Sequence, residues 1–199
     1  MRAERLAAIL LQLYAAACLS GGCAGTAAEV KPSAPDQSPT SLYPLGAGYA
    51  WSYDVDSGDG EPVLAIARVS EFQAGVATVT TGPDAAQRYA TTAQGVQRAG
   101  EPGYLLKAPI EAGASWESAP GVTARVLSVA EQVKTEAGAF SACVLVEEQN
   151  TNSGQRVKTT YCPGVGPAIV VSEMVIRGRT LTVTARLRGY SLGGDEAQP

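Results

Sequence analysis

Hydrophobic and polar residues alternate in short segments from Gly48 onward, and breaks containing Gly, Asp or Pro separate these segments. The alternation is clearest in RTLTVTARLRGY, residues 179–190. One face of this segment carries Leu181, Val183, Ala185 and Leu187. A period of two, with one apolar and one polar face, is typical of antiparallel sheets. The sequence therefore predicts a single all-β domain over residues 43–191, a curved antiparallel meander in the form of a half-barrel, open barrel or sandwich.

One phrase is written twice, as PLGAGYAW from residue 44 and as PIEAGASW from residue 109. The shared positions are Pro44 and Pro109, Gly48 and Gly113, and Trp51 and Trp116. Each Pro is expected just ahead of a strand, because it cannot donate to a ladder. Each Gly permits a bend, and each Trp adds a large apolar surface to the core. We expect two matching corners of the fold; the alternative is a ligand site lined by the two Trp.

The first 22 residues have the organisation of a bacterial signal peptide, with two Arg, an apolar run and small residues at its end. Cys23 follows LSGG and Cys18 follows YAAA, and small residues before a Cys resemble the lipobox of lipoproteins. Cys23 leaves the longer apolar run, so it is the favoured lipidation site, with Cys18 as the alternative. An ordinary signal cleaved near CAGTAA is a further alternative.

Residues 23–42 contain three Pro among Ser, Thr and charged residues, which predicts a disordered tether. Residues 192–199 are expected to form a flexible tail. Cleavage before Cys23 leaves 13 basic and 18 acidic residues, a net charge of −5. Membrane contact is therefore expected from the acyl chains. Ala24 after the lipidated Cys favours the outer membrane, where Asp would favour the inner membrane.

The composition excludes several kinds of site. The chain has no His, which removes the commonest general base and metal ligand. The four Cys lack the C-x-x-C spacing of an all-thiolate metal site. The net charge of −4 leaves no basic surface for nucleic acid. DVDSGDGE, residues 54–61, is rich in carboxylates, but Asp59 and Ala65 stand where an EF-hand needs Gly and Glu. A hairpin turn explains this run, and we expect no metal, no cofactor and no catalytic residue.

The two thiols that remain after lipidation of Cys23 are Cys143 and Cys162, in an oxidising compartment. CVLVEEQ and QRVKTTYC flank the turn formers NTNSGQ, which predicts a hairpin. A turn centred on these residues pairs Glu147 with Lys158 and sets Cys143 opposite Cys162. Opposed residues lie about 4.5 Å apart at Cα, so a disulfide is expected. Two buried free thiols are the alternative.

EAGAFSACVLVE, YCPGVGPAIV and the early PLGAGYAW resemble motifs of a loose family of uncharacterised bacterial envelope lipoproteins. The matching residues are Pro44, Leu45, Gly48, Trp51, Ala137, Gly138, Phe140, Cys143, Val144, Val146, Tyr161, Gly164, Val165, Gly166 and Tyr190. Glu136 departs from the pattern, which has Pro there. The resemblance implies a curved antiparallel β fold on the cell envelope and no known reaction. In CPGV, Gly164 suits the positive φ of a type II turn, and Gly166 frees the chain to begin the next strand.

The leading hypothesis is a non-catalytic, membrane-anchored envelope lipoprotein that binds an apolar or polymeric envelope ligand, or a protein partner, on a curved sheet. One alternative is a structural envelope protein without a ligand. Another is a hydrolase that uses two carboxylates from among Glu117, Glu131, Glu147 and Glu148. A concave, apolar cavity that solvent can reach would favour the leading hypothesis over the structural alternative.

Overall fold

A computed structural model describes residues 35–82 and 85–193. These residues form twelve antiparallel strands and one four-residue helix, which confirms the all-β class. Within them, no helix has the length and apolar character needed to cross a membrane. The predicted signal peptide, Cys18, Cys23 and most of the predicted tether lie outside the described residues.

The helix α1 spans Pro39–Leu42. The first half of the sheet contains β1 (Ala50–Asp56), β2 (Val63–Gln73), β3 (Val76–Thr81), β4 (Ala85–Thr92), β5 (Gly95–Arg98) and β6 (Leu106–Lys107). The second half contains β7 (Ser115–Ala119), β8 (Val122–Thr135), β9 (Gly138–Asn150), β10 (Arg156–Cys162), β11 (Gly166–Ile176) and β12 (Arg179–Ser191).

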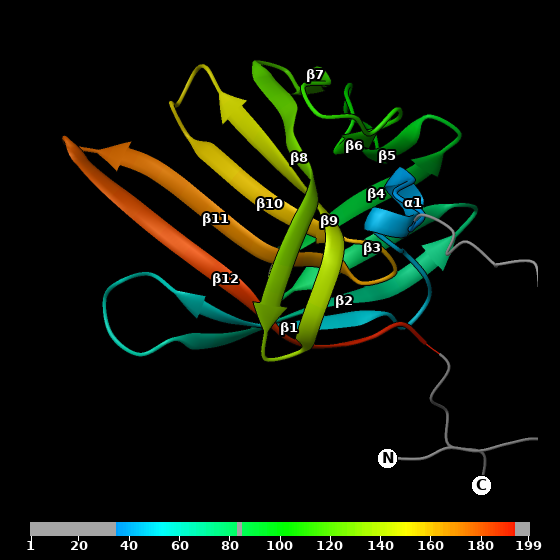
Figure 1. Cartoon of the computed structure of the whole chain (residues 1–199), viewed down its shortest axis with the longest axis horizontal. Helices are drawn as coiled ribbons and strands as arrows, with labels where there is room; N and C mark the ends of the chain where they lie inside the picture. Colours follow the sequence, from blue (N-terminus) through cyan, green and yellow to red (C-terminus); the bar gives the residue numbers. More distant parts are fainter. Residues whose placement is uncertain (1–34, 83–84, 194–199) are drawn as a thin grey trace, which may run out of the picture. The chain divides into compact units, whose positions relative to one another are not determined.

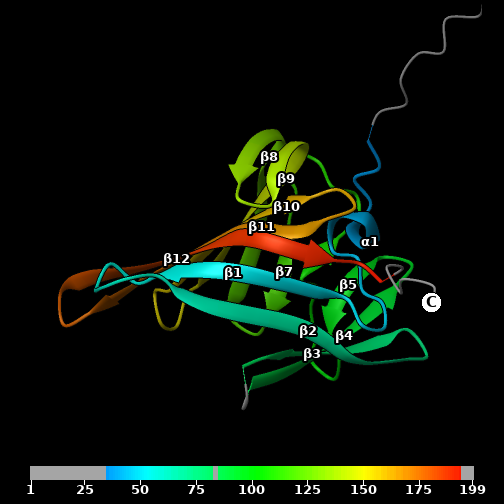
Figure 2. The same ribbon diagram turned by 90° about the horizontal axis from the view of Figure 1, so that it is seen from below.

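The strands form one sheet in the order β6-β5-β4-β3-β2-β1-β12-β11-β10-β9-β8-β7. Each half is thus a six-stranded meander, and the first strand of one half pairs with the last strand of the other. Figure 2 shows β12, β1 and β2 side by side at this junction. The sheet curls round until its two edge strands approach each other, which makes a nearly closed barrel (Figure 1).

The two edges of the sheet meet just before β6 and along β7. The backbone N–H of Tyr104 donates to the carbonyl of Glu117 at 3.2 Å. The indole Nε1 of Trp116 donates to the carbonyl of Tyr104 at 2.6 Å. These bonds between segments at opposite ends of the strand order hold the barrel closed, because both edges gain partners for exposed backbone groups.

The two repeated phrases form matching corners, as predicted. The N–H of Gly48 donates to the carbonyl of Val69 at 3.3 Å, and the N–H of Gly113 donates to the carbonyl of Val126 at 2.9 Å. Both Gly residues have a positive φ, +77° and +88°. A residue with a side chain is strained in that conformation, so the repeated Gly is needed for the bend.

A second sequence match between the two halves supports the first. The tripeptide Ala-Arg-Val occurs at residues 67–69 and 124–126, opposite the two Trp corners. In each copy the strand bulges directly after the Val, where it pairs with the next strand of its own half. The corner, the tripeptide and the bulge together make the two halves structurally equivalent at this point.

Each Trp of the repeated phrases belongs to the core. Trp51 is 1% exposed and donates from Nε1 to the carbonyl of Val165 at 2.7 Å. Val165 lies in the turn CPGV, where Gly164 has φ +68° and the N–H of Val165 donates to the carbonyl of Cys162 at 3.0 Å. A Cβ at Gly166 would lie 3.0 Å from Nε1 of Trp51. Close packing against this Trp is therefore a second reason for Gly at that position.

The register of the β9–β10 hairpin is confirmed. Glu147 lies opposite Lys158, and Val144 lies opposite Tyr161. Cys143 is bonded to Cys162, with a Cα separation of 4.2 Å. The disulfide lies in the buried part of the sheet, since both Cys are almost fully covered.

The last part of the predicted tether is folded, which differs from the expectation that the domain begins at residue 43. Pro39 starts α1, and the hydroxyl of Ser38 accepts from the N–H of Ser41 as an N-cap. Leu42 is fully buried. The side-chain amide of Gln37 donates to two carbonyls of the β8–β9 hairpin, at 2.6 and 2.8 Å. The segment packs because its few apolar residues fill one end of the barrel.

Candidate functional site

The inner face of the sheet carries the buried side chains of Trp51, Tyr53 and Leu187. Residues directly opposite each other in a ladder point to the same face of the sheet. Tyr53 lies opposite Leu187. The inner face can therefore be followed from this buried row, two residues at a time, toward the tip of the β11–β12 hairpin.

The next row of the inner face is apolar across four strands. Val55 on β1 lies opposite Val63 on β2 and Ala185 on β12. Ala185 lies opposite Val170 on β11. Val63 is 65% exposed, although it shares a face with Tyr53. Side chains of the inner face thus become exposed to solvent only one row beyond the aromatic core.

Two further rows continue along β11 and β12. Val183 lies opposite Ser172, and Leu181 lies opposite Met174. Val183 and Leu181 are 38% and 46% exposed, whereas Leu187 on the same face of β12 is fully buried. We call the apolar residues of these three rows the apolar strip: Val55, Val63, Val170, Met174, Leu181, Val183 and Ala185.

The apolar strip corrects the expectation of one buried face along residues 179–190. The predicted alternation is present, and Leu187 is buried as expected. The first half of the strand differs because the covering segments lie elsewhere. In Figure 1, α1 lies at the other end of the barrel from the β11–β12 tip, so the strip faces away from it.

The row through Val183 leads to a polar group inside the barrel. Ser172 lies opposite Val157, and Val157 lies opposite Glu148. A carboxylate oxygen of Glu148 lies 3.5 Å from a guanidinium nitrogen of Arg98. These two side chains line a hollow of about 160 Å³ with Ala119, Val122, Asn150, Gln155 and Val157. One row of the sheet therefore joins an exposed apolar surface to an internal ion pair.

The polar side chains of this row are held by further hydrogen bonds. The amide of Gln155 donates to the hydroxyl of Ser172 at 3.1 Å. The guanidinium of Arg98 also donates to the carbonyl of Ser118 at 3.3 Å. Because Arg98 is bound to both β7 and β9, its position is fixed across the barrel.

Two buried tyrosines lie near this ion pair and remain neutral. Burial raises the pKa of Tyr161, and the nearby carboxylate of Glu148 raises it further. Burial also raises the pKa of Tyr89, against the opposing effect of the Arg98 charge. Neither hydroxyl is therefore prepared to act as a base at neutral pH.

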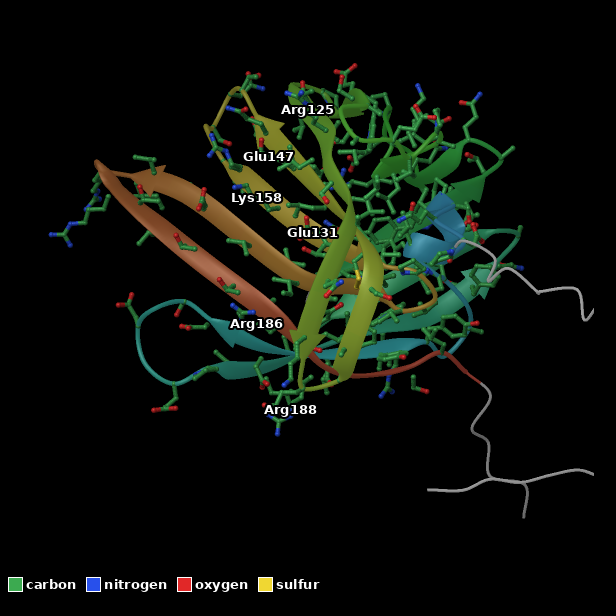
Figure 3. The ribbon with its side chains drawn as sticks, in the orientation of Figure 1. Arg125, Glu131, Glu147, Lys158, Arg186 and Arg188 are labelled. Carbon is green, nitrogen blue, oxygen red and sulfur yellow. A yellow bond between two sulfur atoms is a disulfide. The ribbon has the colours of Figure 1, made fainter. Side chains whose placement is uncertain are left out.

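The four carboxylates considered for hydrolysis do not converge. Glu147 and Glu148 are successive residues of β9 and so point to opposite faces. Glu147 joins an outer row of charges with Arg125 and Lys158, which Figure 3 shows on neighbouring strands. Glu131 lies on β8 opposite Cys143, far along the strand from that row, and Glu117 is exposed on β7.

The acidic run at residues 54–61 forms the β1–β2 turn. Asp56 accepts from the N–H of Gly58 at 2.7 Å, and Gly58 and Gly60 have positive φ. Asp54 points instead along β1 and accepts from Arg188 at 2.9 Å. Turn geometry and one ion pair thus explain the residues that suggested calcium.

No protein-family model matches the chain, and no curated protein matches it. Among solved structures, a Bacteroides fragilis protein described as exported and as having a YmcC-like fold is 14% identical, with a TM-score of 0.43. A Parabacteroides distasonis protein described as a lipoprotein is 13% identical, with a TM-score of 0.39. Each alignment covers 75% of this chain and 98% of the other.

Proposed function

We propose that this protein is a non-catalytic envelope lipoprotein, anchored at Cys23, whose β domain binds an acyl chain or a similar apolar ligand along the apolar strip. The observation that carries the proposal is the exposure of Leu181 and Val183 on the face that is buried elsewhere in the barrel. Apolar surface that continues a core into solvent is characteristic of binding sites.

The geometry of the strip supports an elongated ligand. Its residues follow the inner face over three successive rows, each about 7 Å from the next along the strands. The strip begins beside the aromatic core at Val55 and reaches the β11–β12 tip at Leu181. A chain of methylene groups laid along these rows would cover all three of them.

The polar end of the Val183 row favours an amphiphilic ligand, with an apolar chain and a polar head group, over a plain hydrocarbon. Ser172 and Gln155 stand next to the strip and offer both donors and acceptors. The ion pair of Arg98 and Glu148 lies one strand further on. An apolar chain on the strip would thus place a polar head group beside these side chains.

The dispersed carboxylates and the neutral tyrosines support a non-catalytic role. An acid–base pair needs two groups within reach of one substrate bond. Glu147 and Glu148 lie on opposite faces of β9, and Arg98 already neutralises Glu148. Binding without chemistry is the function that these residues support.

Anchoring at Cys23, in the outer membrane, is tested by fractionation of cells. Cys23→Ser should move the protein from the membrane fraction into the soluble periplasmic fraction. Cys18→Ser, which also follows small residues, serves as the control and should leave the protein in the membrane. The reverse result would assign the lipid to Cys18.

Ligand binding is tested by titration of the purified chain with a fluorescent naphthylamine probe that brightens in apolar surroundings. The double variant Leu181→Gln/Val183→Gln should bind the probe at least about tenfold more weakly, because burial of each side chain contributes about 1.5–3 kcal/mol. Thr180→Gln/Thr182→Gln, on the outer face of the same strand, is the control and should bind normally. Equal binding by both double variants, or no binding by the unaltered chain, would favour a structural protein without a ligand.

A further inference from the structure

The tip of the β11–β12 hairpin combines exposed apolar and basic side chains. Val175 and Ile176 are 61% and 44% exposed. Arg177 and Gly178 form the two-residue turn after them, and both have positive φ, +51° and +76°. Two central residues of positive φ define the tight hairpin turn that best fits twisted strands. The turn therefore presents its side chains at a fixed place.

The basic charge at this tip is unmatched among the described residues. Arg177 and Arg179 are exposed, and neither forms an ion pair there. The nearest acidic residue of the hairpin, Glu173, lies 3.9 Å from Arg156 on β10. The rest of the chain is acidic overall. A basic, apolar tip on an acidic domain fits an anionic, apolar partner.

The neighbouring β1–β2 turn shows the contrast. It carries Asp56, Asp59 and Glu61 and has Val63 and Leu64 only at its end. Figures 1 and 2 show both turns at the same end of the barrel, each formed by a separate hairpin. The two neighbouring turns therefore differ in charge, and the basic, apolar side chains are confined to the β11–β12 tip.

We propose that the β11–β12 tip docks on an anionic phospholipid bilayer, with Val175 and Ile176 at the acyl boundary and Arg177 and Arg179 on the phosphates. Interfacial contacts of this kind combine buried apolar area with attraction between basic side chains and anionic lipid. The role is distinct from ligand binding by the apolar strip, and it adds a second membrane contact to the lipid anchor.

The reach of the chain permits both contacts on one membrane. Cys23 lies 16 residues before Pro39. An extended segment of that length spans up to about 55 Å. The 11 residues of β11, which separate the α1 end of the barrel from the tip, span about 35 Å. The tip can therefore reach the bilayer that holds the anchor.

Docking also gives the apolar strip a source of lipid. Leu181 is the last residue of the strip and lies directly beside the tip on the inner face. A bilayer in contact with Ile176 would adjoin the strip across a single row of the sheet, in which Arg179 lies opposite Ile176.

The test uses the full chain with Cys23→Ser, which removes the anchor, in flotation with vesicles of phosphatidylcholine alone or mixed equally with phosphatidylglycerol. The chain should float with the mixed vesicles and release as salt is raised, because salt screens exposed charges. Arg177→Gln/Arg179→Gln should weaken this binding at least about tenfold. Arg68→Gln/Arg88→Gln removes the same charge from exposed sites on β2 and β4 and should have little effect.

Two further measurements test the apolar contribution to docking and distinguish docking from ligand binding. Val175→Asn/Ile176→Asn should abolish the binding that survives in high salt. Absence of flotation by the unaltered tip, or equal losses in the two arginine pairs, would overturn the docking proposal. Both tip variants should still bind the naphthylamine probe without vesicles. Failure of probe binding with intact flotation would instead overturn the proposed ligand binding and leave docking in place.

Discussion

The two ends of the inner face share their strands and their alternation but differ in what covers them. At one end, the ring of Tyr43 packs against Trp51, Tyr89 and Tyr161, with centroids 5.8, 5.5 and 6.3 Å apart. At the other end, Leu181 and Val183 face the same way and remain exposed. The closed end is closed because α1 brings Tyr43 and Leu42 into it.

The strand determines which side chains share a face, whereas other segments determine whether that face is buried. Along β12, alternation places Leu187 and Leu181 on the same inner face. Whether that face is core or binding surface depends on a segment elsewhere in the chain. Here the segment is residues 39–43, which covers only one end. The exposed end is thus a property of the whole fold and of no single strand.

The closed end should be the most sensitive part of the molecule, and Trp51→Ala tests this most severely. The substitution leaves a large cavity and removes the hydrogen bond to Val165. We expect a loss of about 3–5 kcal/mol in the free energy of unfolding, measured by denaturant titration at constant slope. A loss below about 1 kcal/mol would show that this end is not packed as described.

A matched pair of leucines compares the two ends directly. Leu42→Ala, in α1, should lower the free energy of unfolding by about 2–5 kcal/mol, because Leu42 is fully buried. Leu181→Ala, in the apolar strip, should change it by less than about 1 kcal/mol. Equal losses at both positions would mean that the strip is covered in solution and would break the comparison.

Alkaline pH should act on the closed end through its buried tyrosines. Burial raises the pKa of Tyr43, Tyr53 and Tyr161 above the ordinary value of 10.0. Above pH 10 the unfolded chain loses these protons and the folded chain keeps them. Stability is therefore complete below about pH 10 and falls by about 1.4 kcal/mol per pH unit for each such Tyr as the pH rises further.

The alkaline prediction has its own control variant. Tyr161→Phe removes one of the titrating groups but keeps the ring against Tyr43. Thermal unfolding followed between pH 9 and 11 should show a shallower decline in this variant, by about 1.4 kcal/mol per pH unit. An unchanged decline would mean that Tyr161 is not buried as a neutral hydroxyl.

Local pattern was sufficient for much of the fold. Alternation predicted the strands, and turn chemistry predicted the register that brings Cys143 and Cys162 together. These features depend on residues close in sequence or directly opposite in one hairpin. The matching Trp corners were predicted for the same reason, since the phrase carries its own bend.

Features that depend on contacts outside a single hairpin were not predictable in this way. The bonds between Tyr104 and β7 close the barrel, but the two segments are not paired as one hairpin, and neither sequence indicates that they meet. The packing of Leu42 was not predicted, because the Pro-rich composition of residues 23–42 favours a disordered tether. The short apolar segment at its end, Leu42 and Tyr43, packs into the core instead. The apolar strip was missed as a site because the pattern of residues 179–190 is the same where it is buried and where it is exposed.

Photo-crosslinking with a diazirine-bearing fatty acid tests the central claim most directly. After labelling of the purified chain and digestion with trypsin, the account predicts the label in peptides 159–177 and 180–186, which contain the β11 and β12 residues of the apolar strip. Excess unlabelled fatty acid should compete for these positions. Label confined to peptides that contain no residue of the apolar strip, or spread over the surface without competition, would contradict the claim that the exposed end of the inner face is the binding site.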